Sequence, residues 1–230
     1  MKNFKHQQSG FTLVEIAIVL VIIGLLLGGI LKGQELINSA KVKNLATDFK
    51  TVPLYIYGYQ DRFKALPGDD TKAIANLTST TNPNAAVANG NGDGVISGLW
   101  NSINAADESV QFWLAVRAAN FAPGSTDFSS AAAVTASLPT NVDGGRMGIT
   151  SNTTTGATPT APVAGLTGSY AFCSAGLLGK YAKQLDVTLD DGNTATGSIR
   201  VIPNNSAVGV SALANTAVDD AASFTVCMGF

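Results

Sequence analysis

Gly10-Phe11-Thr12-Leu13-Val14-Glu15 is followed by an apolar run that ends at Leu31. A helix over the roughly 20 residues from Phe11 to Leu31 would be about 30 Å long, which matches the thickness of a bilayer core. Glu15 is the only charged residue in this run. A carboxylate inside a membrane costs on the order of 2.5–3.5 kcal/mol. The sequence therefore predicts a membrane-spanning helix whose single acid needs a positively charged partner.

The residues before Phe11 form a short basic segment. They include Lys2 and Lys5 and end in Gly10. A secretory signal peptide places its apolar region before the cleavage site, whereas here the apolar run follows Gly10. Cleavage after Gly10 would remove the basic segment, keep the helix and create a free amine on Phe11. That amine is the partner we expect for Glu15.

This arrangement resembles the N-terminal signature of type IV pilins and of type II secretion pseudopilins. The resemblance rests on the Lys-rich leader, Gly10, the segment from Phe11 to Glu15 and the apolar run after it. It implies cleavage after Gly10 by a prepilin peptidase, N-methylation of Phe11, and pairing of Glu15 with the Phe11 amine of a neighbouring subunit. A plain single-pass anchor is the alternative, but such an anchor gives no reason for a Gly-Phe pair and a buried acid here.

Composition and charge divide the chain of 230 residues, of which 46% are apolar and 13% are charged. We expect a cleaved leader at 1–10, a transmembrane or filament-core helix at 11–31, an amphipathic stem at 32–64 and a globular head at 65–230. The stem has six basic and three acidic residues, and the head has six basic and twelve acidic residues. Attraction between stacked subunits and an ordinary solvated helix face both explain this distribution. The acidic head argues against binding of nucleic acid.

Apolar residues three and four positions apart continue the helix through the stem. They are Val42, Leu45, Phe49, Val52, Ile56, Tyr59 and Phe63. This spacing places them on one helix face, so we expect that face to pack on the head. A short coiled coil is the competing interpretation. Pro53 removes one helical hydrogen bond and is expected to bend the helix.

Periodicity and turn residues predict the elements of the head. The expected helices span 107–119 and 176–185, and the expected strands of an antiparallel sheet span 186–189, 197–202 and 223–227. An Asp-Gly turn at 190–193 is expected to form a hairpin. Residues 71–92 and 124–168 are expected to be loops, the second with one or two short strands. The fold class is therefore α+β, and the resemblance implies a pilin-like fold with a long, partly transmembrane helix packed on the head.

The sequence contains two cysteines, Cys173 and Cys227. An even count in an exported domain favours one disulfide. The bond would close a loop of about 55 residues and contribute roughly 4 kcal/mol in the chain-entropy model. The pair also resembles the cysteines that pin the C-terminal region of many type IV pilins. Two free buried thiols are the alternative.

One loop resembles the first half of an EF-hand calcium site. The expected ligands are the side chains of Asn89, Asn91, Asp93 and Glu108 and the carbonyl oxygen of Val95. Gly94 allows the tight turn that such a loop needs, but Trp100 stands where an EF-hand has its bidentate Glu. Asp69 or Asp70 is a further candidate to approach the site. The alternative is an Asn/Gly turn whose side chains bond to their own backbone.

The remaining chemistry argues against an enzyme. The only histidine, His6, lies in the predicted leader, so the mature chain would have no Ser-His or Cys-His pair. We expect a structural pilin whose partners are further copies of itself in a helical filament, the prepilin peptidase, an inner-membrane assembly platform and the membrane. It would cross the inner membrane once before assembly and lie in an extracellular filament afterwards. A minor pseudopilin of a secretion system and a pilus-displayed adhesin are the alternatives, and no cofactor other than calcium is expected.

Overall fold

The computed structural model describes residues 12–77, 87–153, 161–206 and 208–230. The chain divides into two compact units, residues 1–40 and residues 41–230. We call the second of these the head unit.

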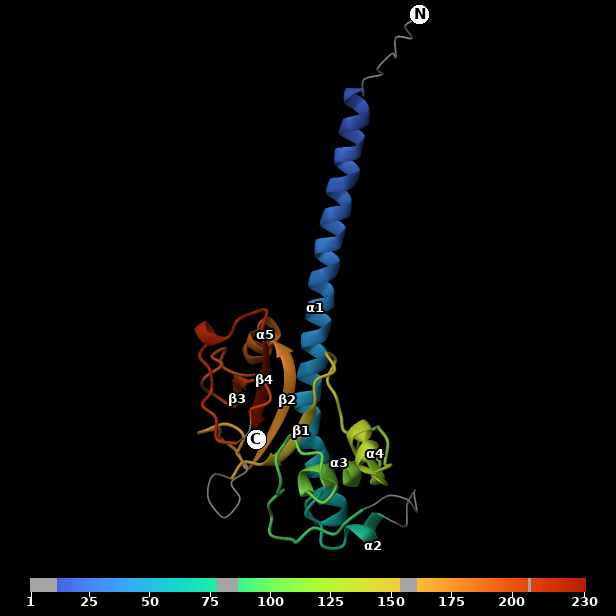
Figure 1. Ribbon diagram of the computed structural model, residues 1–230, viewed down its shortest axis with the longest axis vertical. Helices are drawn as coiled ribbons and strands as arrows, with labels where there is room; N and C mark the ends of the chain where they lie inside the picture. Colours follow the sequence, from blue (N-terminus) through green and yellow to red (C-terminus); the bar gives the residue numbers. More distant parts are fainter. Residues whose placement is uncertain (1–11, 78–86, 154–160, 207) are drawn as a thin grey trace, which may run out of the picture. The chain divides into compact units, whose positions relative to one another are not determined.

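The head unit contains a four-stranded antiparallel sheet, drawn in Figure 1. Its strands are β1 (Met147–Ser151), β2 (Tyr170–Leu178), β3 (Ile199–Pro203) and β4 (Ser223–Gly229). They lie in the order β1-β2-β4-β3. The C-terminal strand β4 therefore occupies the interior of the sheet. The antiparallel sheet predicted from the sequence is confirmed.

One face of the sheet packs against α1 (Leu13–Phe63). The predicted stripe of the stem is buried at Val42, Leu45, Phe49, Val52, Ile56 and Tyr59, and Phe63 is half-buried. The ring of Phe49 meets that of Phe172 on β2 at 4.9 Å between centroids. The helix continues through Pro53. Burial of this stripe is what attaches the second part of α1 to the head.

The opposite face of the sheet carries the disulfide. Cys173 on β2 and Cys227 on β4 are directly paired in the register, with Cα atoms 4.1 Å apart, and form a disulfide. The two cysteines belong to a cluster of buried residues on this face. Its other members are Trp100, Val163, Leu166, Ala171, Ala175 and Ile202. The side chains of Phe172 and Cys173 thus lie on opposite faces of the sheet, because successive side chains of a strand alternate between its two faces. The predicted disulfide is confirmed.

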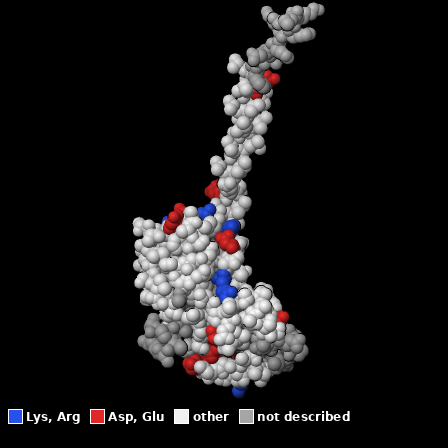
Figure 2. All heavy atoms as spheres, viewed as in Figure 1, with Lys and Arg blue, Asp and Glu red and all other residues white. Residues whose placement is uncertain are grey.

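The first unit contains the beginning of α1. From Leu13 to Leu31 its side chains are exposed, and charged side chains are sparse along this stretch (Figure 2). Lys32 Nζ and Glu35 Oε2 form an ion pair of 2.7 Å. Among the described residues, α1 is the one helix whose length and composition suit a membrane span.

The sequence predictions for residues 176–193 of the head unit are partly wrong. The helix expected at 176–185 is α5 (Gly179–Leu189), and residues 176–178 belong to β2. The strand expected at 186–189 is the last turn of α5. The N–H of Asp190 still donates to the carbonyl of Asp186 at 2.7 Å, which continues the helical pattern. The predicted hairpin is also wrong, because the turn at 190–193 follows a helix and β3 pairs with β4.

Short helices lie in segments that were expected to be loops. They are α2 (Ala73–Leu77) and α4 (Ala131–Ser137). A 3-10 turn, η1 (Asn215–Ala217), lies near the C-terminus, where the sequence made no prediction. The hydroxyl of Ser130 accepts a hydrogen bond from Ala133 N–H and caps α4. By contrast, α3 (Glu108–Ala118) agrees with the helix predicted at 107–119, and β1 with the short strands expected in the segment 124–168.

Candidate functional site

The carboxylate of Glu15 caps the start of α1. Thr12 N and Thr12 Oγ1 donate to Glu15 Oε2 at 2.8 and 2.7 Å, and Glu15 N donates to Thr12 Oγ1 at 3.3 Å. This reciprocal pair is a capping box, which satisfies N–H groups that the first helical turn leaves without partners. None of the ion pairs among the described residues includes Glu15. Gly10 and Phe11, the predicted sites of cleavage and methylation, lie outside the described residues.

The predicted calcium loop brings two of its acids together with a third. Carboxylate oxygens of Asp69, Asp93 and Glu108 all lie within 4.8 Å of one another. Asp69 is almost fully buried and accepts hydrogen bonds from Gly92 N at 2.6 Å and Gly94 N at 2.8 Å. Asp69, which precedes Gly92 by 23 residues, therefore holds the backbone of the loop from its buried side.

The other predicted ligands are engaged within the protein. The amide oxygen of Asn89 accepts from Ile74 N at 2.9 Å, and that of Asn91 accepts from Asp93 N at 2.9 Å. Asp93 accepts from Val95 N at 2.8 Å. Glu108 accepts from Asn91 N, Ser97 N and Ser97 Oγ. The bonds of Asn91 and Asp93 to the backbone two residues on are those of the Asn/Gly turn that the sequence left as the alternative, whereas Asn89 and Glu108 accept from more distant segments. The three clustered carboxylates are oxygen donors of the type that calcium binds. Calcium binding here stays a prediction.

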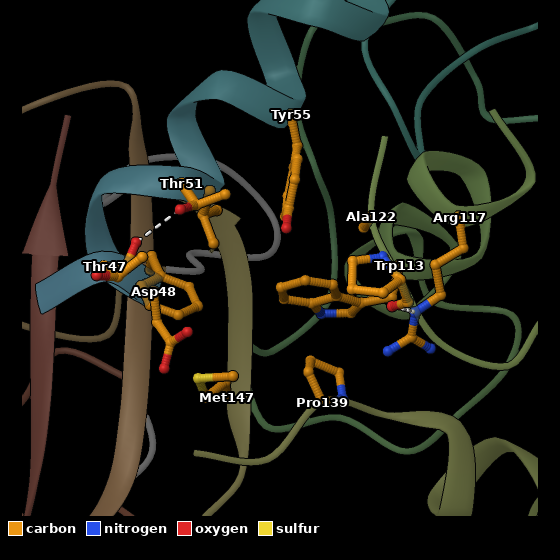
Figure 3. Close-up of a pocket in the computed structure, with 12 residues that line it drawn as sticks. Thr47, Asp48, Thr51, Tyr55, Trp113, Arg117, Ala122, Pro139 and Met147 are labelled. Atoms are coloured by element: carbon orange, nitrogen blue, oxygen red, sulfur yellow. Dashed lines mark hydrogen bonds between the residues drawn. The ribbon is translucent and has the colours of Figure 1, made fainter. Parts of the chain in front are cut away.

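A cavity of about 290 Å³ opens between α1, α3 and the sheet (Figure 3). Its lining includes Asp48, Tyr55, Trp113, Arg117 and Met147. Figure 3 shows Trp113 in the middle, with Tyr55 pointing toward it and Arg117 beside it. Two threonine hydroxyls in the lining donate to carbonyl oxygens of their own helix, at 2.9 and 2.7 Å. These are the bonds that threonine hydroxyls commonly make to the preceding turn of a helix.

Arg117 is buried beside this cavity and serves a structural role. Its guanidinium donates to the carbonyl oxygens of Pro123 and Ser125, each at 3.1 Å, and to that of Ser137. Burial lowers the pKa of this guanidinium. A Cβ at Gly124 would lie 2.5 Å from Arg117 Nε, so the glycine allows the loop to close over the guanidinium. The arginine thereby ties the loop after α3 to the end of α4.

Residues 5–31 match the family model of the prokaryotic N-terminal methylation motif. The chain carries the signature of type IV pilins and pseudopilins. Neither a curated protein nor a solved structure matches the chain. The pilin signature implies processing by a prepilin peptidase and association with a membrane, and proteins that carry it are structural rather than enzymatic. With the apolar start of α1, it fits a membrane-anchored precursor.

Beyond the pilin signature, the head unit contains an acidic group of which the sequence placed only Asp190 and Asp191 together, in the turn predicted at 190–193, where with Asn193 they were a weaker candidate for cation binding than for an ordinary turn. Asp186, Asp190 and Asp191 lie at the C-terminal end of α5, with carboxylate oxygens within 4.8 Å of one another. A helix extended to residue 189 would have placed positions 186 and 190 on one face. The alternating sequence Asp186-Val187-Thr188-Leu189 instead suggested a strand. The strand predicted at 186–189 therefore kept Asp186 apart from the two acids of the turn.

Proposed function

We propose that this chain is a pilin, a structural subunit of a type IV pilus assembled from the inner membrane after cleavage of its leader. The observation that most supports this proposal is Glu15, which is the only charged residue in the apolar run from Phe11 to Leu31. The match of residues 5–31 to the methylation motif supports it. A prepilin peptidase and an inner-membrane assembly platform would be its partners, and the extracellular filament its destination.

On assembly, Glu15 would replace its hydrogen bonds to Thr12 with a stronger contact to a neighbouring subunit. In the single chain the carboxylate accepts two hydrogen bonds from Thr12, one from the hydroxyl and one from the backbone. A neighbour's Phe11 ammonium would offer a hydrogen bond between two charged groups, which is roughly twice as strong as one between neutral groups. The exposed apolar side chains from Leu13 to Leu31 would be buried against those of other subunits. The charge pair would then fix the axial register of the filament.

Replacing Glu15 tests this role. We expect Glu15→Val to leave the precursor membrane-inserted and processed but to reduce surface filaments strongly. The matched control is Glu35→Ala, since Glu35 is on the same helix but pairs with Lys32. Filaments are counted by electron microscopy of sheared cell surfaces, and processing is followed by the size of the protein. Normal filaments from Glu15→Val would refute the proposal.

A minor pseudopilin of a type II secretion system is the second candidate, since the motif at residues 5–31 is common to both classes. Deletion of the gene separates the two. Loss of surface filaments indicates a pilin, and loss of protein secretion without loss of filaments indicates a pseudopilin. Binding of a host ligand by the head would instead support an adhesin displayed on the pilus.

A further inference from the structure

Asp186 is an acidic residue near the C-terminal end of α5 in the head unit. It is fully buried, and neither of its carboxylate oxygens has a hydrogen-bond partner in the part of the chain that the structure describes. Burying an ionised carboxylate without a partner is strongly unfavourable. The position therefore calls for a proton or for a positive charge that the described residues do not supply.

Two further acids approach the same point. Asp190 and Asp191 follow Asp186 by one helical turn, and the three residues bring carboxylate oxygens within 4.8 Å of one another. Asp190 Oδ2 accepts from Ile199 N at 2.7 Å, while no described residue donates to its second oxygen. A Cβ at Gly197 would lie 2.0 Å from Asp190 Oδ2, so only glycine there allows this approach.

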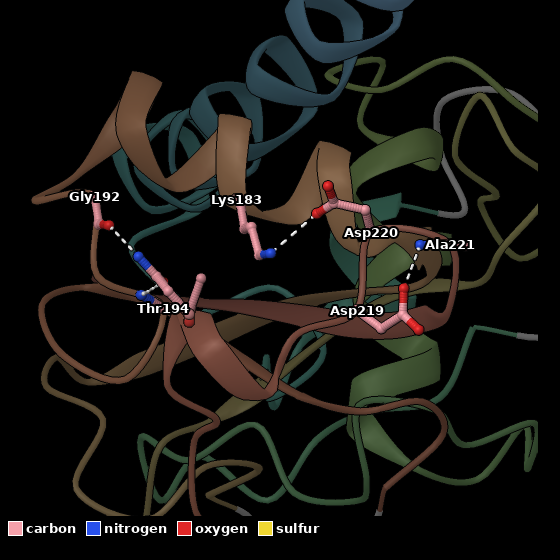
Figure 4. Close-up of polar contacts among 7 residues, drawn as sticks. Lys183, Gly192, Thr194, Asp219, Asp220 and Ala221 are labelled. Carbon is pink, nitrogen blue, oxygen red and sulfur yellow. Dashed lines mark hydrogen bonds and ion pairs between the residues drawn. The ribbon is translucent and has the colours of Figure 1, made fainter.

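The turn after α5 holds Asp191 in place. Asp191 accepts from Asn193 N at 2.8 Å and from Thr196 Oγ1 at 2.7 Å. Asn215 on η1 closes the same turn by donating to the carbonyl of Gly192 at 2.9 Å and accepting from Thr194 N at 2.9 Å. Gly192 and Thr194 are labelled in Figure 4. The carboxylates are thus positioned by β3, by the turn and by η1.

The three carboxylates lie in a region where most of the nearby charge is negative, although the positive charge of Arg200 attracts Asp191. They lie at the C-terminal end of α5, where the helix dipole disfavours further negative charge. The nearby lysine on α5, Lys183, is already paired with Asp220 at 2.9 Å (Figure 4). The guanidinium of Arg200 donates to the carbonyl oxygens of Gly197 and Ala164. None of the four ion pairs among the described residues includes Asp186, Asp190 or Asp191.

We propose that Asp186, Asp190 and Asp191 bind a hard divalent cation of the size of Ca²⁺. Oxygen ligands of one calcium ion at 2.3–2.6 Å are at most about 4.6–5.2 Å apart, which accommodates the observed spacing. The buried carboxylate of Asp186 gives the second, independent reason, because its two oxygens accept no hydrogen bond from the described residues. Water would complete the coordination. The bound ion would connect the end of α5 to the turn that leads into β3.

The experiment must separate this site from the loop of Asp69, Asp93 and Glu108. We therefore use the full-length chain in detergent, with Asp93→Asn as the background variant, after removal of calcium with EGTA. Calcium is then titrated by calorimetry and by thermal unfolding. We expect the Asp93→Asn protein to bind calcium and to unfold several degrees higher when the ion is saturating.

Adding Asp186→Asn should abolish this response or weaken calcium affinity at least about tenfold. Asp191→Asn, at an exposed position, should weaken it as well and serves as the variant least prone to misfolding. Asp219→Asn is the matched control, because Asp219 is an exposed acid that accepts from Ala221 N (Figure 4). The proposal is overturned if the Asp93→Asn protein binds no calcium up to about 10 mM, which exceeds the range of extracellular calcium modules. It is equally overturned if Asp186→Asn leaves the affinity unchanged.

Discussion

At the scale of single residues, the carboxyl group of Asp186 makes the stability of the head depend on pH. Burial raises its pKa to about 7, and the charges of Asp190 and Asp191 act in the same direction. The ordinary pKa of an Asp side chain is near 3.9. Between about pH 4 and pH 7 the folded state therefore keeps a proton that the unfolded state has lost, so in the absence of a cation the free energy of unfolding falls as pH rises through this window.

Asp186→Asn removes this titration. In EGTA, we expect the variant to be more stable than the wild type at pH 8, by on the order of 1–3 kcal/mol, and nearly equal to it near pH 4. Urea unfolding at a series of pH values between 4 and 8 measures the difference. Parallel curves for the two proteins over this range would contradict the raised pKa.

A candidate site could be predicted from the sequence only where its residues stand out from their immediate neighbours in the chain. The Thr12–Glu15 segment was conspicuous because one acid interrupts an apolar run. Asp69 was named as a candidate to approach the loop, but its hydrogen bonds to the N–H groups of Gly92 and Gly94 form only after the chain has folded back. Arg117 lies in the helix that the sequence predicts at 107–119. Its three carbonyl partners lie in segments without periodicity, so no local pattern identified them.

At the scale of elements, the disulfide connects two neighbouring strands of the sheet, β2 and β4. It closes a segment of 54 residues, for which the chain-entropy model gives roughly 4 kcal/mol. Cys173→Ala and Cys227→Ala each remove the same bond. We expect each variant to lose about 2–5 kcal/mol of unfolding free energy, by equal amounts within error.

Chemical denaturation with and without a reductant checks this expectation. Reduction should bring the wild type to the stability of the variants, and it should leave the double variant Cys173→Ala/Cys227→Ala unchanged. Unequal losses in the two single variants would mean that packing in the cluster around Trp100, and not the bond, dominates the effect.

Elements were predictable where one periodicity extended over many residues. The stripe from Val42 to Tyr59 identified α1, and β3 and β4 followed from alternation. The end of α5 was missed because Val187 and Thr188 are β-branched, which favours a strand locally. Burial of Tyr181, Ala182 and Leu185 against the sheet outweighs that preference. The helices α2 and α4 are too short to show a helical period.

At the scale of the whole molecule, the proposed function fixes the covalent state of the mature protein. Protein purified from sheared cell surfaces should begin at Phe11, carry one methyl group on its terminal amine and contain the intact disulfide. Intact mass and N-terminal sequencing report the first two properties, and the mass before and after reduction reports the third. A protein that still begins at Met1 would rule out assembly through the Phe11 amine.

The cross-strand disulfide has a consequence for proteolysis. The connection between Cys173 and Cys227 encloses α5, β3 and η1. A protease that cuts any loop between the two cysteines produces two fragments that stay covalently joined. Such a nicked subunit would migrate as a single chain on a non-reducing gel and separate into two bands after treatment with a thiol.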